Sequence, residues 1–230
     1  MTKVFIISAP SGSGKSTLVK GVREIVPGLK FSISYTTRAP RGSERDGCEY
    51  FFVSRSRFEK MIANDEFLEH ADVFGNYYGT ARRFLSDAEQ SQQDLLLDID
   101  VQGAAQIKRK IPQAISIFVL PPDRKTLEAR LRDRGQDAEQ VIERRLATAT
   151  REIENYDKYD YILVNDRLPD SIEELKSILL AERLKRPGVE IPSEHVALIA
   201  KADRWRLGNV RQRVQPILAS FVTAATQGGR

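Results

Sequence analysis

The stretch Ala9-Pro10-Ser11-Gly12-Ser13-Gly14-Lys15-Ser16-Thr17 decides the fold of this 230-residue chain. It matches the phosphate-binding loop pattern, except that Ala9 stands where glycine is commonest. Gly12 and Gly14 allow backbone N–H groups to converge on phosphate oxygens, and Lys15 supplies a mobile cation. The Ser16 hydroxyl can ligate Mg²⁺. The alternative is a chance Gly/Ser loop, but the flanking elements favour a nucleotide-binding loop.

These flanking elements have the order of an α/β nucleotide-binding domain. A short apolar run over residues 3–8 predicts a buried strand before the loop, and residues 16–26 have helical spacing after it. Further buried strands are expected at 94–99, 114–120 and 159–164, each followed by a helical pattern (101–110, 123–134 and 170–184). This alternation predicts a parallel sheet wrapped by helices.

Three stretches depart from the alternation. Residues 30–93 contain short, mixed strands (31–35, 50–53, 67–73 and 76–80) with helical segments at 55–64 and 82–91, which predicts a small α+β insertion. Residues 124–151 carry eight Lys/Arg against five Asp/Glu, which indicates an arginine-rich helical flap. In the tail, an apolar set at helical spacing predicts a packed helix; it comprises Val214, Ile217, Leu218, Phe221 and Val222.

The composition excludes several classes of protein. Hydrophobic residues make up 41% and charged residues 30%, which is typical of a soluble globular chain. The apolar runs are far shorter than the ~20 residues of a membrane span, and no signal-peptide pattern is seen. The single Cys48 excludes a disulfide framework and fits a reducing cytoplasm. The net charge of +4 allows nucleic-acid binding, but a solvated surface with a basic tail is favoured.

A second motif extends from Thr36 to Val53, with the sequence TTRAPRGSERDGCEYFFV. It satisfies every fixed position of the guanylate kinase signature, T-[ST]-R-x-x-[KR]-x-x-[DE]-x-x-G-x-x-Y-x-[FY]-[LIVMK]. Together with the phosphate-binding loop, the chain resembles guanylate kinases over residues 3–184. The resemblance implies a P-loop α/β core with a GMP-binding insertion and a helical lid. It also implies a cytoplasmic enzyme of purine nucleotide metabolism and GMP recycling, which uses Mg²⁺ and transfers the γ-phosphoryl group of ATP to GMP to give ADP and GDP.

The insertion is expected to bind GMP. Two arginines three residues apart, Arg38 and Arg41, can grip a dianionic phosphate, although a solvated turn is the alternative. In the family, Glu69 fills the position that accepts the N1–H and 2-amino donors of guanine. Adenine lacks both donors and would leave the carboxylate unpaired. The complete expected GMP set is Ser34, Arg38, Arg41, Tyr50, Glu69, Tyr78, Thr80 and Asp100.

The resemblance assigns ATP binding to the loop at residues 9–17, together with Arg130 and Asn165. Arg130, Arg134 and Arg145 match lid arginines, for which a salt-bridged surface helix is the alternative. The expected catalytic set is Lys15, Arg38, Arg134 and Arg145. For the metal, Ser16 is the expected ligand and Asp98 is expected to act through water. A helix N-terminal charge is the alternative for Asp98.

The expected division of the chain is a P-loop core (1–32, 94–123 and 152–186), a GMP-binding insertion (33–93), a lid (124–151) and a helical extension (187–230). ATP and GMP are the expected partners. Nucleic acid and membrane are not expected, and a homo-oligomer is left open. A non-catalytic guanylate-kinase-like interaction module would share the fold, but such modules typically lack an intact phosphate-binding loop. A kinase for another nucleoside monophosphate would have no reason to carry Arg38, Arg41 and Glu69 at these positions.

Overall fold

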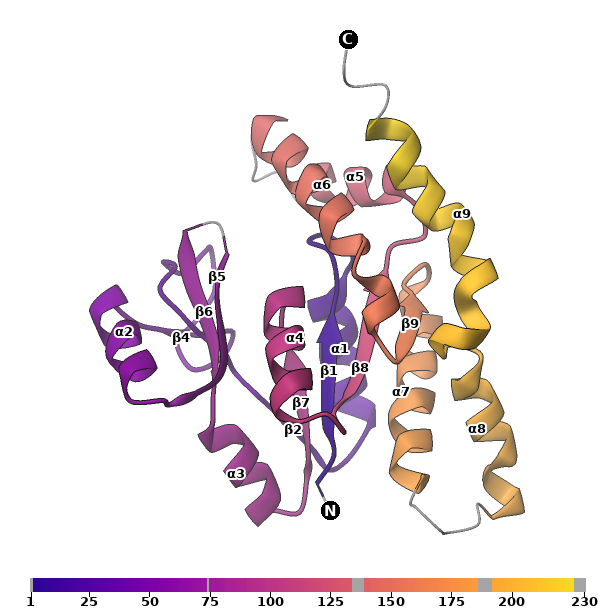
Figure 1. Cartoon of the computed structure of the whole chain (residues 1–230), viewed down its shortest axis with the longest axis horizontal. Coiled ribbons are helices and arrows are strands. Elements are labelled where there is room, and N and C mark those ends of the chain that lie inside the picture. The colour runs from indigo at the N-terminus through magenta and orange to yellow at the C-terminus, as the bar shows by residue number, and fades with distance from the viewer. Residues whose placement is uncertain (1, 74, 134–138, 186–191, 226–230) are drawn as a thin grey trace. The chain divides into compact units, whose positions relative to one another are not determined.

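The computed structural model describes residues 2–73, 75–133, 139–185 and 192–225, and it has the predicted α/β architecture with a parallel sheet flanked by helices (Figure 1). The larger sheet has the strand order β2-β7-β1-β8-β9. Its strands are β1 (Val4–Ser8), β2 (Leu29–Phe31), β7 (Asp94–Asp98), β8 (Ile115–Leu120) and β9 (Tyr161–Val164). The pairs β2–β7 and β8–β9 are parallel, and every residue of β8 is buried. Continuous apolar strands such as β8 are typical of parallel sheets covered on both faces.

A smaller sheet has the order β4-β3-β6-β5 and lies within the predicted insertion. Its strands are β3 (Tyr35–Thr36), β4 (Phe51–Phe52), β5 (Phe67–Val73) and β6 (Asn76–Ala81). The described helices are α1 (Lys15–Ile25), α2 (Arg55–Ala63), α3 (Arg83–Gln90), α4 (Val101–Lys110), α5 (Arg124–Asp133), α6 (Glu139–Ile153), α7 (Leu168–Leu184), α8 (Val196–Asp203) and α9 (Leu207–Ala225). Short 3₁₀ turns occupy Tyr156–Lys158 and Ser193–His195.

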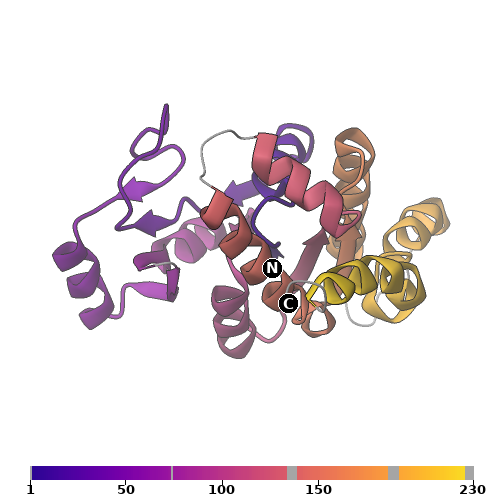
Figure 2. The same ribbon diagram turned by 90° about the horizontal axis from the view of Figure 1, so that it is seen from above.

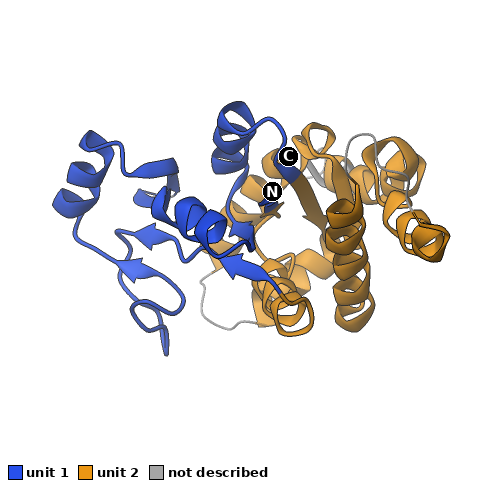
Figure 3. Cartoon of the chain, turned by 90° about the horizontal axis from the view of Figure 1, so that it is seen from below, with its two compact units in different colours: residues 1–6, 28–115 blue, residues 7–27, 116–230 orange. Residues whose placement is uncertain are grey.

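The chain divides into two compact units (Figure 3). Unit 1 comprises Met1–Ile6 and Gly28–Ile115, and unit 2 comprises Ile7–Pro27 and Ser116–Arg230. In unit 1, α3 packs on β2 and β7, and α4 packs on β5. In unit 2, α1 packs on α7, and α7 packs on β9. No helix in the described parts of the chain is long and apolar enough to cross a membrane.

Most predicted elements are confirmed to within two residues, but the strand expected at 31–35 is wrong. Residues 29–31 form β2, which pairs with β7 in the larger sheet, whereas Tyr35 and Thr36 form β3 in the smaller one. The Ser32 N–H still donates to the Leu96 carbonyl oxygen at 3.1 Å, after which the chain leaves the larger sheet. The stretch from residue 29 to residue 36 therefore contributes one strand to each sheet, and the spacing of its apolar residues does not show where the chain passes from one sheet to the other.

Over its described residues, 192–225, the C-terminal extension is largely helical, as predicted, and contains α8 in addition to α9. Figures 1 and 2 show these helices at one side of unit 2, where α8 packs on α7 and α9 packs on α5, α6 and β9. Val214, Ile217 and Phe221 are buried on α9. Val222, which was expected on the same face, is 67% exposed because it lies at the edge of the apolar stripe.

A polar network built on the buried Glu182 and Tyr161 joins this extension to α7 and β9. The Glu182 carboxylate accepts hydrogen bonds from the Tyr161 hydroxyl, from Arg206 Nη2 at 2.8 Å and from Lys185 Nζ at 3.2 Å. Asp203 accepts from Lys185 at 3.0 Å and from Arg206 at 2.9 Å. Burial and the bond to Glu182 raise the pKa of Tyr161, so this hydroxyl remains a donor. The network fixes the extension because each charge in it has a partner.

We predict that Glu182→Ala lowers the free energy of unfolding by about 2 to 3 kcal/mol, because it leaves the buried Tyr161 hydroxyl without its acceptor and removes one of the two carboxylates that pair with Lys185 and Arg206. Urea titration measures the loss. Glu173→Ala is the matched control, since Glu173 pairs with Lys176 on the exposed surface of α7 and is expected to cost about 0.5 kcal/mol or less. Equal losses in the two variants would contradict a stabilising network.

Candidate active site

The predicted phosphate-binding loop connects β1 to α1 and has the backbone geometry that anion binding requires. Gly12 (φ 94°) and Gly14 (φ 83°) are both in the left-handed region, which L side chains rarely adopt. The Ser13 N–H donates to the Pro10 carbonyl oxygen at 3.1 Å and closes the turn. Helix α1 begins at Lys15 and has no acidic residue in its first turn. Its N-terminal N–H groups therefore favour a bound anion.

Asn165, directly after β9, supports this loop from behind. Its side chain is buried, and Nδ2 donates to the Ser13 carbonyl oxygen at 2.7 Å. A Cβ atom on Gly14 would lie 2.5 Å from the same Nδ2, so only glycine fits at this position. The sequence assigned Asn165 to ATP through the resemblance, but it gave no signal of this contact with the loop.

Two of the predicted flap arginines lie beside the loop or its support. Arg145 on α6 donates from Nη2 to the Ser11 hydroxyl at 2.8 Å, and Arg130 on α5 donates to the Asn165 carbonyl oxygen at 3.0 Å. Unit 2 therefore brings together the loop, Arg130, Arg145 and Asn165. Arg134 lies outside the described residues.

In unit 1, Arg38 is held rigidly among aromatic and acidic groups. Its guanidinium makes a two-pronged ion pair with Glu44, with Nη1–Oε2 and Nη2–Oε1 distances of 2.9 and 3.0 Å. Nε donates to the Tyr78 hydroxyl at 3.1 Å, and the Tyr50 ring centroid lies 5.3 Å from Cζ. The structure thus brings Arg38, Tyr50 and Tyr78 together, as expected for one anion-binding site.

Glu44 is the residue that the sequence analysis missed at this point, although it occupies the fixed acidic position of the second motif. Its Oε2 also accepts the Arg41 N–H at 2.8 Å, while the Arg41 side chain is exposed. Burial alone would raise the pKa of the Glu44 carboxyl, but the hydrogen bonds from Arg38 and Arg41 hold it below its usual value. Glu44 therefore stays charged and orders the Arg38 side chain and the backbone at Arg41. Ser34, at the start of this region, is half-buried.

Glu69 is a buried carboxyl on β5, paired in register with Thr80 on β6. It is 3% exposed, and burial raises its pKa to about 7. The nearby Asp100 raises this pKa further, whereas the backbone N–H of Thr80 and the charge of Lys110 lower it. A carboxyl in such a site is poised to become charged when a ligand brings hydrogen-bond donors.

Asp100 and Gly103 form the wall beside Glu69. Asp100 is the N-cap of α4, and its Oδ1 accepts the Gly103 N–H at 2.9 Å. A Cβ atom on Gly103 would lie 2.5 Å from Glu69 Oε2. Glycine at this position leaves room for the carboxylate, which the sequence analysis did not anticipate. Unit 1 thus collects Glu69, Thr80 and Asp100 from β5, β6 and the start of α4.

The expected metal residues belong to different parts of the fold. Ser16 is exposed in the first turn of α1, and Asp98 is the half-buried last residue of β7. Within the described ranges, His, Cys, Asp and Glu do not form a cluster of three or more that could hold a metal ion. A hydroxyl and a carboxylate oxygen are hard ligands, which suit an ion that keeps several waters and substrate phosphates, as Mg²⁺ does.

This fold and these two sets of residues define a P-loop nucleotide-binding protein of the nucleoside monophosphate kinase class. The comparison with known families agrees, because the guanylate kinase family model matches residues 1–182. The chain is 58% identical to the guanylate kinase of Koribacter versatilis (strain Ellin345) over 224 residues, which are 96% of each chain. It is 48% identical to that of Escherichia coli (strain K12) over 86% of this chain and 96% of the relative.

A solved structure gives the same result. The crystal structure of guanylate kinase from Anaplasma phagocytophilum superposes with a TM-score of 0.66 at 34% sequence identity, covering 80% of this chain and 87% of the other. The chain belongs to the guanylate kinase family.

We predict that Glu69→Gln gains stability relative to the unsubstituted chain as the pH rises from about 4.5 to 7. In this window the folded chain holds the Glu69 proton that the unfolded chain has already lost, since burial raises the pKa from 4.5 to about 7. Folding stability from Glu69 therefore falls with rising pH, by up to about 1.4 kcal/mol per unit, and the Gln variant escapes this loss. Urea titrations at both ends of the window measure the difference. A difference as constant as that of the exposed control Glu66→Gln would contradict the prediction.

We predict that Asn165→Ala lowers the free energy of unfolding by about 1 to 3 kcal/mol, because the Ser13 carbonyl oxygen loses its buried donor. It should also weaken ATP binding, which isothermal titration calorimetry measures. The control is Asn209→Ala, which removes a similar bond, from Nδ2 to the Asp203 carbonyl oxygen at 2.8 Å, from an exposed position. Unchanged ATP affinity in the Asn165 variant would contradict its support of the loop.

Proposed function

We propose that this chain is an enzyme that transfers the γ-phosphoryl group of ATP to GMP and gives ADP and GDP. Its membership of the guanylate kinase family supports this function. Curated guanylate kinases also support it, because the match to this chain covers 96% of the length of each. The structural observation that supports GMP as the acceptor, rather than another nucleoside monophosphate, is the buried Glu69 carboxyl beside Thr80. Guanine offers its N1–H and 2-amino donors to this acceptor and adenine lacks both, so the wrong base would leave the buried carboxyl without a partner.

The acceptor phosphate is assigned to the arginine loop of unit 1. Arg38 is already oriented by Glu44 and Tyr78, so little side-chain entropy is lost when it grips an anion. Arg41 is exposed and can move onto the phosphate. Ser34, Tyr50 and Tyr78 add hydroxyl donors to this set, and Asp100 completes the wall beside the base.

The donor nucleotide is assigned to unit 2. Backbone N–H groups of the loop at 9–17 hold the phosphates of ATP, and Lys15 at the start of α1 neutralises their terminal charge. Arg130 and Asn165 are assigned to ATP binding as well, because Asn165 contacts the loop at Ser13 and Arg130 contacts Asn165. Arg145 contacts Ser11 of the loop, which supports a role for this cation in stabilising the charge that develops on the migrating group.

The chemistry requires no covalent intermediate, because the GMP phosphate is itself a competent nucleophile at neutral pH. Catalysis then comes from alignment and from cations that stabilise the charge of the transition state. Lys15, Arg38, Arg134 and Arg145 supply those cations in this proposal. Ser16, with Asp98 acting through water, would hold Mg²⁺, which shields the β- and γ-phosphate charges of ATP.

We also propose a role for each segment of the chain. Residues 33–93 would recognise GMP, residues 124–151 would form the lid, and residues 1–32, 94–123 and 152–186 would form the P-loop core. The reducing cytoplasm is the proposed location, because Cys48 is exposed and is a free thiol. A non-catalytic interaction module finds no support in these comparisons, and the intact Gly14-Lys15-Ser16 argues against it.

A coupled assay of ADP release tests the function, with GMP, AMP, UMP and no acceptor compared in the presence of Mg·ATP. We predict turnover with GMP that exceeds turnover with AMP by about 10⁴-fold in kcat/KM. Lys15→Ala should nearly abolish that turnover, since it removes a cation that acts mostly in the transition state. Activity with AMP but not GMP would overturn the assignment of Glu69, and no turnover with any acceptor would favour a binding module.

A further inference from the structure

The small sheet of unit 1 has a second face that the proposed function does not use. Side chains along a strand alternate between the two faces of a sheet. On β6, Tyr78 reaches Arg38, whereas its neighbour Tyr77 stacks on Phe58 of α2 at a centroid distance of 5.3 Å. Ala81 shares the parity of Tyr77, and on β3 Tyr35 stacks on Phe51 at 4.8 Å. The α2 side of the sheet is therefore opposite to the face that presents Tyr78.

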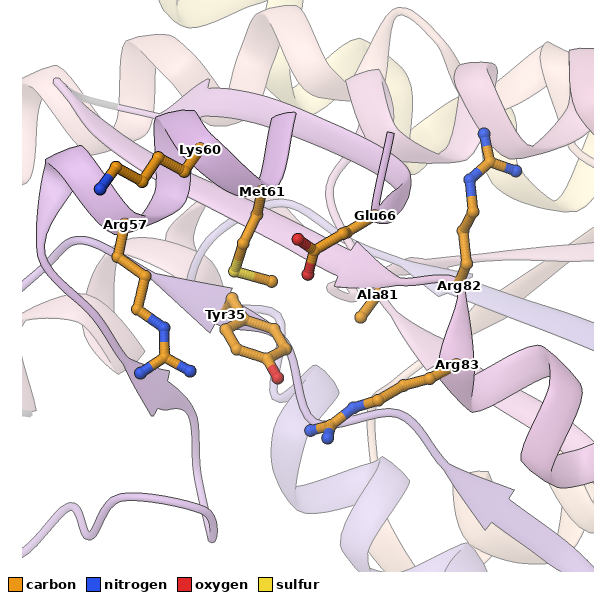
Figure 4. A pocket seen from close by; sticks show the side chains of 8 residues that line it. All are labelled: Tyr35, Arg57, Lys60, Met61, Glu66, Ala81, Arg82 and Arg83. Carbon is orange, nitrogen blue, oxygen red and sulfur yellow. The ribbon is translucent and has the colours of Figure 1, made fainter. Parts of the chain in front are cut away.

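This α2 side contains a pocket of about 510 Å³ (Figure 4). A volume of this order falls within the range of roughly 300 to 1,000 Å³ that small-molecule sites occupy. The residues that line the pocket are Tyr35, Arg57, Lys60, Met61, Glu66, Ala81, Arg82 and Arg83.

The charge of the pocket is strongly positive. Arg82 is neutralised by Asp65, with an Nη2–Oδ1 distance of 2.8 Å. In the part of the chain that the structure describes, no carboxylate forms an ion pair with Arg57, Lys60 or Arg83. The only acid in the lining is Glu66, which already accepts a hydrogen bond from Asn64 Nδ2 at 3.1 Å. Three unpaired cations around one concavity attract an anion of more than one charge.

The pocket also has an apolar floor and one oriented cation. Tyr35, Met61 and Ala81 are each at least nine-tenths buried, so their contact surfaces are fixed by packing. The Arg83 guanidinium lies over the Tyr35 ring at 5.6 Å and over the Phe51 ring at 5.1 Å. Figure 4 shows that Arg83 extends along the pocket toward the Tyr35 hydroxyl. Such stacking reduces the entropy that Arg83 would lose on binding an anion.

We propose that this pocket is a second anion site that binds a small phosphate-bearing molecule of the nucleotide type. The phosphates would lie against Arg57, Lys60 and Arg83, and the apolar part would lie on Tyr35, Met61 and Ala81. Glu66 provides an acceptor for a donor group on the base. The site is separate from that of Arg38 and does not depend on the proposed function.

Met61 provides a direct probe of this pocket, because the chain has only two methionines, Met1 and Met61. The full chain is labelled with ¹³C-methyl methionine, so that Met61 reports binding at this pocket, and the charge variants described below separate this response from binding at the proposed substrate sites. Pyrophosphate and ADP are then titrated separately. We expect both to shift the Met61 methyl resonance saturably, with ADP binding at least about threefold more tightly through its apolar contacts. No shift with either probe overturns the site, and a shift with pyrophosphate alone overturns its nucleotide character.

Charge variants then test which residues bind the anion. Arg57→Glu is expected to weaken binding of both probes by about tenfold or more, and Lys60→Gln by severalfold. Arg109→Glu is the matched control, because Arg109 is exposed on α4 in the same unit and does not line the pocket; its affinity should equal that of the parent. Thermal unfolding verifies that each variant is folded. Equal weakening in the Arg57 and Arg109 variants, or full affinity in the Arg57 and Lys60 variants, would overturn the proposal.

Discussion

The hydrogen bond from Asn165 to the Ser13 carbonyl oxygen is the contact on which unit 2 depends most directly. It joins residues 152 positions apart in the sequence, one in the phosphate-binding loop and one after the last strand of the larger sheet. Parallel strands bring their carboxyl ends to one edge, and this is where ligands bind in such folds. Because the bond is buried and Gly14 leaves no room for a side chain beside it, the loop is held in a conformation that an anion can enter.

Unit 1 solves a different electrostatic problem. Burying a charged carboxylate costs free energy, and burial raises the pKa of Glu69 to about 7, so the carboxyl can keep its proton near neutral pH. Arg38 is also buried, but it keeps its charge because Glu44 is fixed against it by two hydrogen bonds. Unit 1 therefore contains one permanently charged group, Arg38, and one group whose charge can change, Glu69. In the proposed function, specificity for guanine follows from Glu69, since only a ligand with donors favours its charged form.

The sequence predicted the elements well where local chemistry determines them. The loop at 9–17 and the continuous apolar strands were found because glycine, lysine and buried runs carry their own signals. Positions 31–35 were misassigned because one apolar stretch enters two sheets. The site residues on the second motif could be named from its spacing, but the Glu44 ion pair, the Gly103 contact with Glu69 and the Asn165 contact with Ser13 could not. Each of these depends on distances between segments that lie far apart in the sequence or that turn sharply.

The two faces of the small sheet present different side-chain chemistry. Because side chains alternate along a strand, Tyr78 lies on the face of the sheet that contacts Arg38, and Ala81 lies on the opposite face, toward α2. A sheet that only recognised GMP could cover its second face with an ordinary apolar contact and neutral surface groups. Instead, Arg57, Lys60 and Arg83 surround a concave floor without acidic partners among the described residues. An anion that binds in this pocket would offset this concentration of positive charge.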